Sequence, residues 1–325
     1  MRNLILLSLV MVSFLSCGQK KKPPKLVVGI VVDQMRYDYL TRFWEKYGDG
    51  GFKKIIKQGF NCKNTHYNYM PTYTGPGHAS IYTGTTPKNH GIIANTWYDK
   101  NNGKWKYCTG DRVENTIGST TSAGKMSPRN LLGTTITDEL KLATNNKGKV
   151  IAMSIKDRGA ILPGGHKADA AYWYDGGDEG KWISSTYYME QLPNWVQKIN
   201  KSNLSNTYLN GKWETMLPLH QYQESIADDN PYEGTFNKEE APVFPHNLKA
   251  LRDSNHNYSL IKTTPFGNTI LKELAIAAIE GEQLGADEFT DFLAVSFSST
   301  DYIGHQYGPM SVEIEDTYLR LDRDL

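Results

Sequence analysis

A threonine stands directly before the start of a helix in the motif Thr74-Gly75-Pro76-Gly77-His78. Proline fits the first turn of a helix because the N–H that it lacks would have no partner there, so we expect Thr74 at or just outside the N-cap. The positive end of a helix favours both an alkoxide on this threonine and an anion bound to the free amides. The motif therefore indicates a nucleophile beside an anion site, although an ordinary threonine N-cap has the same pattern.

Charged side chains follow three apolar runs that are typical of buried strands. The pairs of run and side chain are residues 26–32 with Asp33, residues 149–155 with Lys156 and Arg158, and residues 291–297 with Asp301. The carboxyl ends of strands in an open parallel sheet face the ligand crevice, so we expect these side chains to lie together near Thr74. Taken alone, Asp33 could merely cap the next segment, and the two cations could lie in a solvated loop.

The types of these residues indicate what they could bind. Arg158 can hold an anion with a planar fork and Lys156 with a point charge. Asp301 and His305 are four residues apart, so one helical turn would bring carboxylate and imidazole to the same side, as a zinc ion requires. Asn95 could donate an amide to the site or be only a turn residue before a hairpin around residues 100–104.

In their order along the chain, these motifs resemble the alkaline phosphatase superfamily. The resemblance includes the Thr-Gly-x-x-Pro and His-Gly-Ile segments between Thr83 and Ile92, and residues 154–160 narrow it to the PafA type, the phosphate-irrepressible alkaline phosphatases with a threonine nucleophile. It implies an α/β fold with a central, mostly parallel sheet flanked by helices. It also implies zinc-dependent hydrolysis of small-molecule phosphate monoesters through a phosphothreonine intermediate.

The resemblance assigns a role to each candidate residue. Thr74 would be phosphorylated and then hydrolysed, and the phosphate ligands would be Asn95, Lys156 and Arg158. Of the two zinc ions, Asp301 and His305 would bind one, and Asp33 and the Thr74 oxygen would bind the other.

The family's remaining metal ligands, an Asp-His pair and a further His, lie beyond the Asp-x-x-x-His motif, and no histidine follows His305. We therefore expect the front part of a longer protein, with the C-terminal part of the fold missing. We expect weak zinc binding, low activity, one uncovered sheet edge, and an uncovered apolar stripe on a helix at residues 312–325.

Functions of other classes make different demands on the same positions. A sulfatase would need Cys or Ser at position 74 and Arg at position 78, so Thr74 and His78 argue against it. A nucleotide pyrophosphatase or phosphodiesterase shares Thr74 and Asn95 and stays the main alternative. An inactive fragment that binds phosphorylated ligands is the non-enzymatic alternative.

The N-terminal residues indicate export. Residues 1–16 have one positive charge and then an apolar run, which predicts a signal peptide, and residues 14–17 resemble a lipoprotein box in which Cys17 would be lipidated. A conventional cleavage site before Cys17 is the alternative. We expect a periplasmic or outer-membrane-anchored lipoprotein that contacts the membrane only through Cys17, with no later membrane span. Cys62 and Cys108 could then form a disulfide.

The rest of the 325-residue chain predicts one large domain. After a tether at residues 17–25, residues 26–325 would form the incomplete catalytic domain, with an aromatic-rich cap inserted at about 167–262. We expect helices at residues 131–143, opened by Ser127-Pro128, and at residues 269–280, capped by Asn268. The net charge of +1 gives no indication of nucleic-acid binding, and the sequence makes no prediction about the oligomeric state.

Overall fold

The computed structural model describes residues 22–325, so the predicted signal peptide and Cys17 lie outside the described residues. A six-stranded sheet forms the centre of the fold, in the order β1-β8-β5-β6-β7-β4. The strands are β1 (Leu26–Val32), β4 (Thr116–Ile117), β5 (Val150–Ser154), β6 (Ala170–Asp175), β7 (Lys181–Ser185) and β8 (Asp291–Phe297). The first four strands in this order are parallel, and β7 and β4 are antiparallel to their neighbours. The predicted α/β fold with a mostly parallel sheet is confirmed.

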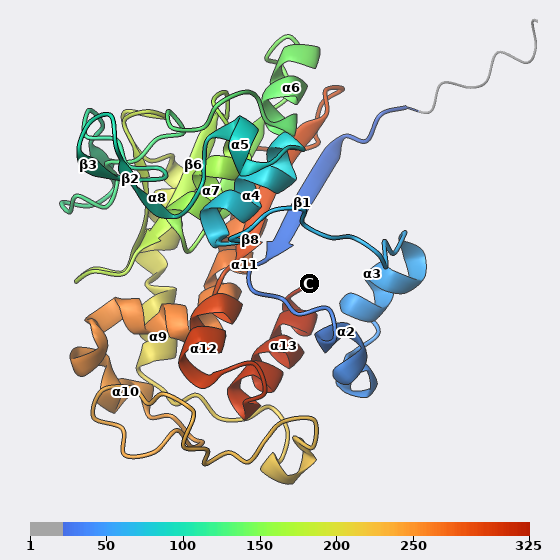
Figure 1. Cartoon of the computed structure of the whole chain (residues 1–325), viewed down its shortest axis with the longest axis vertical. Helices are drawn as coiled ribbons and strands as arrows, with labels where there is room; N and C mark the ends of the chain where they lie inside the picture. Colours follow the sequence, from blue (N-terminus) through green and yellow to red (C-terminus); the bar gives the residue numbers. More distant parts are fainter. Residues whose placement is uncertain (1–21) are drawn as a thin grey trace, which may run out of the picture.

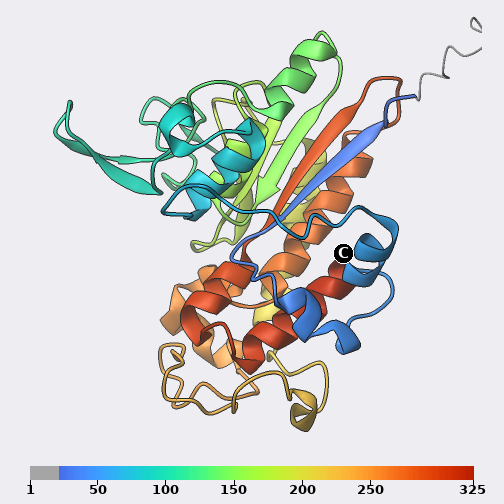
Figure 2. The ribbon, with the colours of Figure 1, turned by 45° about the vertical axis from the view of Figure 1, so that its right-hand side comes forward.

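Helices cover both faces of this sheet (Figures 1 and 2). One face carries α4 (Thr74–Thr83), α5 (Pro87–His90), α6 (Ile136–Ala143) and α7 (Asp157–Gly164). The other carries α8 (Asn194–Ser202) and the long α11 (Phe266–Gly281). The buried side chains of β5 and β8 alternate between these two layers, as successive residues of a strand must.

The remaining elements lie at the carboxyl ends of the parallel strands or beside the sheet (Figure 1). They are α2 (Tyr39–Arg42), α3 (Phe52–Gln58), α9 (Leu204–Leu209), α10 (Leu248–Leu251), α12 (Ser299–Tyr307), α13 (Val312–Asp324), and the 3-10 turns η1 (Trp44–Lys46), η2 (Leu219–Gln221), η3 (Arg252–Asn255) and η4 (Asn257–Thr263). The predicted hairpin is also present, as β2 (Thr96–Asp99) and β3 (Lys104–Tyr107), and it projects away from the sheet (Figure 2).

The edge strand β1 differs from the prediction of a strand buried on both faces. Val28 and Ile30 are each 44% exposed, and within residues 22–325 the strand pairs only with β8. Helix α11 packs mainly on β8 and β5. The prediction of an uncovered sheet edge is therefore confirmed.

The prediction of an uncovered apolar stripe on the last helix is wrong. The apolar side chains of α13 are buried, and the Tyr318 ring lies 4.6 Å from the Tyr39 ring. The carboxylate of Asp322 also accepts hydrogen bonds from the backbone N–H groups of Gly48 and Phe52. The segment after β1, which is distant in sequence, therefore supplies the partner that the helical periodicity alone could not identify.

Two predicted helix starts are also wrong. Helix α6 begins after a capping box formed by Thr135 and Asp138, and not at Ser127-Pro128. Helix α11 begins at Phe266, and the side-chain oxygen of Asn268 accepts a hydrogen bond from the Ser299 N–H instead of capping its own helix.

The predicted boundary of the inserted cap also differs. Residues 170–185, which we assigned to the cap, form β6 and β7 of the central sheet.

The predicted disulfide is absent: both cysteines are free thiols, with Cys62 exposed and Cys108 buried. Cys108 packs in an apolar cluster with Ala79, Ile92 and Leu162, away from the surface. Within residues 22–325, no helix combines the length and the apolar character that a membrane span requires.

Candidate active site

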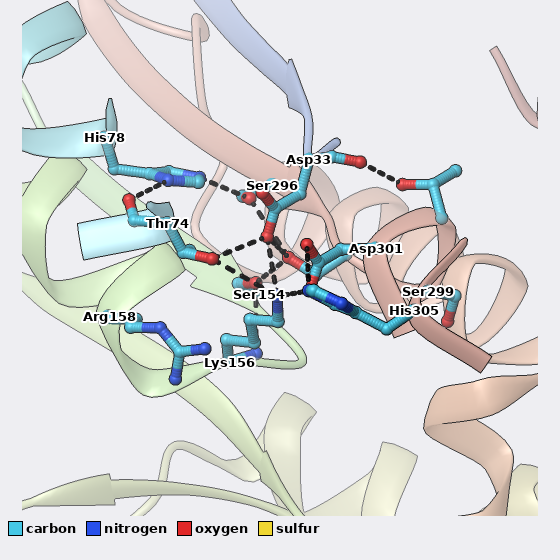
Figure 3. Close-up of polar contacts among 12 residues, drawn as sticks. Asp33, Thr74, His78, Ser154, Lys156, Arg158, Ser296, Ser299, Asp301 and His305 are labelled. Carbon is cyan, nitrogen blue, oxygen red and sulfur yellow. Dashed lines mark hydrogen bonds and ion pairs between the residues drawn. The ribbon is translucent and has the colours of Figure 1, made fainter. Parts of the chain in front are cut away.

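Thr74 is the first residue of α4, with Tyr73 at the N-cap, and its hydroxyl donates a hydrogen bond of 3.2 Å to Oδ2 of Asp33 (Figure 3). Asp33 directly follows β1, and both side chains are buried. The helix start and the strand end therefore meet, as the sequence predicted. Because Asp33 accepts this hydrogen bond, the lone pairs of the Thr74 oxygen point away from the carboxylate.

Asn95 lies beside the same helix start. Its side-chain oxygen accepts a 2.7 Å hydrogen bond from the Gly75 N–H, one of the free amides of the first turn. A Cβ on residue 75 would lie 3.0 Å from this oxygen, so glycine permits the close approach. Because the oxygen is engaged, the NH₂ group of Asn95 is the end left to donate to a bound anion.

Lys156 connects the acidic residues of the site. Its ammonium lies 2.7 Å from Asp33 Oδ2 and 3.3 Å from Thr74 Oγ1, and it also forms an ion pair with Asp301. The side chain is only 1% exposed. Burial alone would raise the pKa of Asp33, but the Lys156 charge and hydrogen bond outweigh it, and the pKa lies below its ordinary value. Asp33 is therefore a carboxylate near neutral pH.

Helix α12 brings Asp301 and His305 to the same side, as their spacing predicted. His305 Nε2 lies 3.4 Å from Asp301 Oδ1, and the His305 side chain is 73% exposed. Two hydroxyls that the sequence analysis missed fix this helix against β1: Ser298 donates to the Asp33 carboxylate at 3.3 Å, and Thr300 donates to the Asp33 backbone oxygen at 2.6 Å. Both residues belong to the Ser298-Ser299-Thr300 segment that directly follows the apolar strand β8, and this position was the available signal.

Arg158 lies next to this group without joining it. Its Nη1 donates a 3.0 Å hydrogen bond to the Tyr107 hydroxyl, which in turn donates to Asp157 at 2.8 Å. Burial lowers the pKa of the guanidinium, but Tyr107 and Asp157 outweigh that effect and raise it. Tyr107 belongs to β3, so the hairpin positions the arginine. Sequence reasoning missed this contact because the two residues are far apart in the chain.

His78 supports the nucleophile from one helical turn below. Its Nδ1 donates to the Thr74 backbone oxygen at 2.8 Å, and its Nε2 accepts from the Ser296 hydroxyl at 2.7 Å. A carbonyl can only accept, so these partners fix the Nδ1–H tautomer. Burial lowers the pKa of His78, and the ring is neutral near pH 7. The histidine therefore ties α4 to β8 without adding a charge.

The donor set can be compared with the predicted zinc ions. The carboxylates of Asp33 and Asp301 both contact one cation, the Lys156 ammonium, with the Thr74 hydroxyl and the His305 imidazole alongside. Oxygen and nitrogen donors around a cation fit zinc in kind. Among residues 22–325, however, no group of three or more His, Cys, Asp or Glu is arranged to hold a metal ion. Two ligands per ion is one fewer than a catalytic zinc site usually has, so the zinc ions stay a prediction.

Comparison with known proteins adds to this geometry. The family described as Type I phosphodiesterase / nucleotide pyrophosphatase matches residues 27–325. Alkaline phosphatase PhoV of Synechococcus elongatus is 55% identical over 302 residues, which are 93% of this chain and 54% of the relative. The chain spans little more than half the length of the curated relatives it matches.

Solved structures agree with the sequence matches. A crystal structure of wild-type alkaline phosphatase PafA superposes with a TM-score of 0.91 at 50% identity, covering 94% of this chain and 59% of that one. A mutant of alkaline phosphatase PafA, changed at one threonine, one asparagine, one lysine and one arginine, gives a TM-score of 0.90 at 49% identity with the same coverage.

Proposed function

The chain belongs to the Type I phosphodiesterase / nucleotide pyrophosphatase family, and from its similarity to the alkaline phosphatases PhoV and PafA we propose that it is the nucleophile-bearing part of a zinc-dependent phosphate monoester hydrolase, an alkaline phosphatase. The observation that carries the proposal is the position of the Thr74 hydroxyl at the start of α4, between the Asp33 carboxylate and the Lys156 ammonium. A hydroxyl nucleophile, a proton acceptor and a cation for the phosphoryl oxygens are then adjacent. Phosphoryl transfer depends mainly on such positioning and charge.

In the proposed reaction, the Thr74 oxygen forms a bond to phosphorus while the bond from phosphorus to the substrate alcohol breaks. Asp33 accepts the hydrogen bond of the hydroxyl and orients its oxygen for the attack. The proton that Thr74 loses passes to solvent, and the leaving oxygen takes a proton from solvent and departs as the alcohol. Water then cleaves the phosphothreonine, which returns the Thr74 hydroxyl and releases phosphate. His78 acts as a positioning residue, because its bonds to Thr74 and Ser296 fix the nucleophile's backbone.

The phosphoryl oxygens would be bound by Arg158, Lys156 and the NH₂ group of Asn95. These are the same residue types as three of the four replaced in the PafA mutant, and Thr74 matches the fourth. Asp301 and His305 would hold one zinc, and Asp33 and Thr74 the other, each with further ligands beyond this set. When bound, zinc would lower the pKa of the Thr74 hydroxyl and neutralise charge on the leaving oxygen.

Two alternatives stay testable. The first alternative is a phosphodiesterase, the kind of enzyme that the family description itself names. Two cations, Lys156 and Arg158, favour the monoesterase, because a monoester carries one more full charge than a diester. The other alternative, a phosphate-binding protein without catalysis, predicts no turnover of any phosphate ester.

The proposed function is tested in the complete enzyme with p-nitrophenyl phosphate and with mass spectrometry of the acid-quenched protein. We expect turnover that chelation abolishes, a phosphoryl group trapped on the peptide that contains Thr74, and no trapping in Thr74→Ala. Thr74→Ser keeps a hydroxyl and is the matched control, with activity and label retained. Turnover without a labelled peptide would overturn the phosphothreonine step, and metal-loaded protein without any turnover would overturn the hydrolase.

We also propose that the protein is exported and anchored through a lipid on Cys17. The test is the membrane fraction of cells that express Cys17→Ala compared with Cys62→Ala, which leaves the anchor unchanged. Release of only the first variant is expected. Equal retention of both would leave the conventional cleavage site.

A further inference from the structure

The Lys156 ammonium has three N–H groups, and three oxygens of the candidate active site accept hydrogen bonds from them (Figure 3). These oxygens are Oδ2 of Asp33 at 2.7 Å, Oγ1 of Thr74 at 3.3 Å, and Oδ2 of Asp301. The lysine side chain is buried, so the contacts are made away from solvent. In this arrangement Lys156 has no N–H left for a phosphoryl oxygen.

Arg158, the other cation assigned to the phosphate, keeps free donors. Its Nη1 donates to the Tyr107 hydroxyl at 3.0 Å, whereas its buried Nε makes no hydrogen bond. A guanidinium has five N–H groups, so one such contact leaves several for an anion. The two cations therefore differ in their availability, although they are only two positions apart in the chain.

The acceptors of Lys156 are also the groups that the proposed zinc ions need. Asp33, Thr74 and Asp301 are three of the four residues assigned to zinc, and the fourth, His305, lies 3.4 Å from Oδ1 of Asp301. Zinc binds a carboxylate oxygen at about 2.0–2.2 Å, and it would repel an ammonium held by the same groups. The ammonium and the metal are therefore alternative partners of these oxygens.

The ring of Tyr302 gives the ammonium a partner outside the proposed zinc ligands. Tyr302 follows Asp301 on α12, and its ring centroid lies 4.9 Å from Lys156 Nζ. The face of a phenol ring attracts a cation without using a carboxylate oxygen. Because the lysine side chain has a flexible four-carbon stem, the ammonium can turn beside this ring while it stays charged.

We propose that Lys156 is an exchangeable counter-ion, whose ammonium neutralises Asp33 and Asp301 until these carboxylates bind zinc and then turns to the phosphoryl group. The proposal rests on the proposed function for the identity of the metal and of the substrate phosphate. It adds an order of events, because Arg158 has donors for phosphate in either state whereas Lys156 contributes only after metal binding. The two carboxylates have a cationic partner before and after the exchange.

Crystal structures of the complete enzyme test the exchange directly, one after EDTA treatment and one loaded with zinc and inorganic phosphate. We expect Lys156 Nζ within hydrogen-bond distance of Asp33 and Asp301 in the first structure. In the second, Nζ should contact a phosphate oxygen and neither carboxylate. An ammonium that stays on both carboxylates in the zinc-loaded enzyme, or that contacts neither of them in the EDTA-treated enzyme, would overturn the proposal.

Zinc affinity, measured in the complete enzyme by competition with a chelator, is a second readout that does not depend on turnover. Lys156→Met removes the competing ammonium, so zinc should bind at least ~10-fold more tightly, the scale of one charge-assisted contact. Arg158→Met is the matched control, because Arg158 acts on the Asp33 charge but forms its ion pair with Asp157. Zinc should bind this variant less than ~3-fold more tightly, since a charge without direct contact is more strongly screened.

Equal tightening in the two variants, or unchanged zinc affinity in Lys156→Met, would contradict the exchange. Circular dichroism in EDTA checks that each variant is folded, and the two crystal structures of the unaltered enzyme carry the test if Lys156→Met is not. Failure of the proposed function is distinguishable. An enzyme that shows the exchange without ester turnover would refute only the hydrolase, and turnover with Lys156 fixed on both carboxylates would refute only the exchange.

Discussion

The ammonium nitrogen of Lys156 lies 2.7 Å from Oδ2 of Asp33, although the two residues are 123 positions apart in the chain. This contact joins the end of β5 to the end of β1, across the intervening strand β8. Because Lys156 also pairs with Asp301 at the start of α12, one buried cation holds two carboxylates together. Without it, two negative charges would face each other at the centre of the site.

The first prediction is that Lys156→Met destabilises the metal-free protein by about 3–5 kcal/mol, the cost of leaving a buried charge unpaired. Urea unfolding in EDTA measures this free energy. Lys249→Met, which removes an exposed lysine, is the control and should change stability by less than about 0.5 kcal/mol. Equal stability of the two variants would show that Lys156 does not compensate Asp33 and Asp301.

The second prediction separates the two enzyme classes. In the complete enzyme, Arg158→Ala or Lys156→Ala should lower kcat/KM for a phosphate monoester by roughly ten- to a thousandfold, the scale of one charge-assisted contact in the transition state. Hydrolysis of a matched diester should fall much less, because its transition state carries less charge at that position. Steady-state kinetics with p-nitrophenyl phosphate and bis-p-nitrophenyl phosphate measure both. Equal losses, or a wild type that prefers the diester, would assign the phosphodiesterase.

The third prediction concerns a buried histidine beneath α12 and α13. His246 Nδ1 lies 2.8 Å from Glu239 and Nε2 lies 3.2 Å from Glu313. Burial alone would lower the pKa of His246, but the two carboxylates raise it to about 9. The pKa of Glu313 is also raised, because burial outweighs its pairing with the histidine. The ion pairs therefore depend on a protonated His246.

A histidine whose pKa is higher in the folded state adds stability below its unfolded pKa, near 6.5, and loses it as pH rises toward 9. We expect the free energy of unfolding to fall by roughly 2–3 kcal/mol across this window. Urea unfolding at several pH values measures the slope, and His246→Gln should flatten it. The same slope in both proteins would contradict a charged His246.

The fourth prediction replaces the disulfide that the sequence suggested. Cys62 is exposed and should react with iodoacetamide in the native protein, whereas Cys108 should react only after denaturation. Burial raises the pKa of the Cys108 thiol to about 12, so little thiolate forms near neutral pH. Peptide mapping distinguishes the two sites. A linked peptide that contains both cysteines would contradict the free thiols.

Local patterns were sufficient for the parts of the site that chemistry places at the ends of elements. Thr74 before Gly-Pro-Gly predicted a helix start, and the apolar run before Asp33 predicted a strand end in the crevice. Asp301 and His305 share a helical turn because of their spacing alone. These predictions needed only backbone geometry within about ten residues, which the sequence determines directly.

The contacts between distant elements were decided only by the tertiary structure. The pairing of Lys156 with Asp33, the hydrogen bond from Arg158 to Tyr107 and the burial of α13 against Tyr39 each join segments far apart in the chain. Val28 and Ile30 have the same β-branched pattern as a buried strand, yet the sheet order puts β1 at an edge. Sequence periodicity describes the face that each element presents, whereas its partner depends on the order of strands in the sheet and on which helices reach each face.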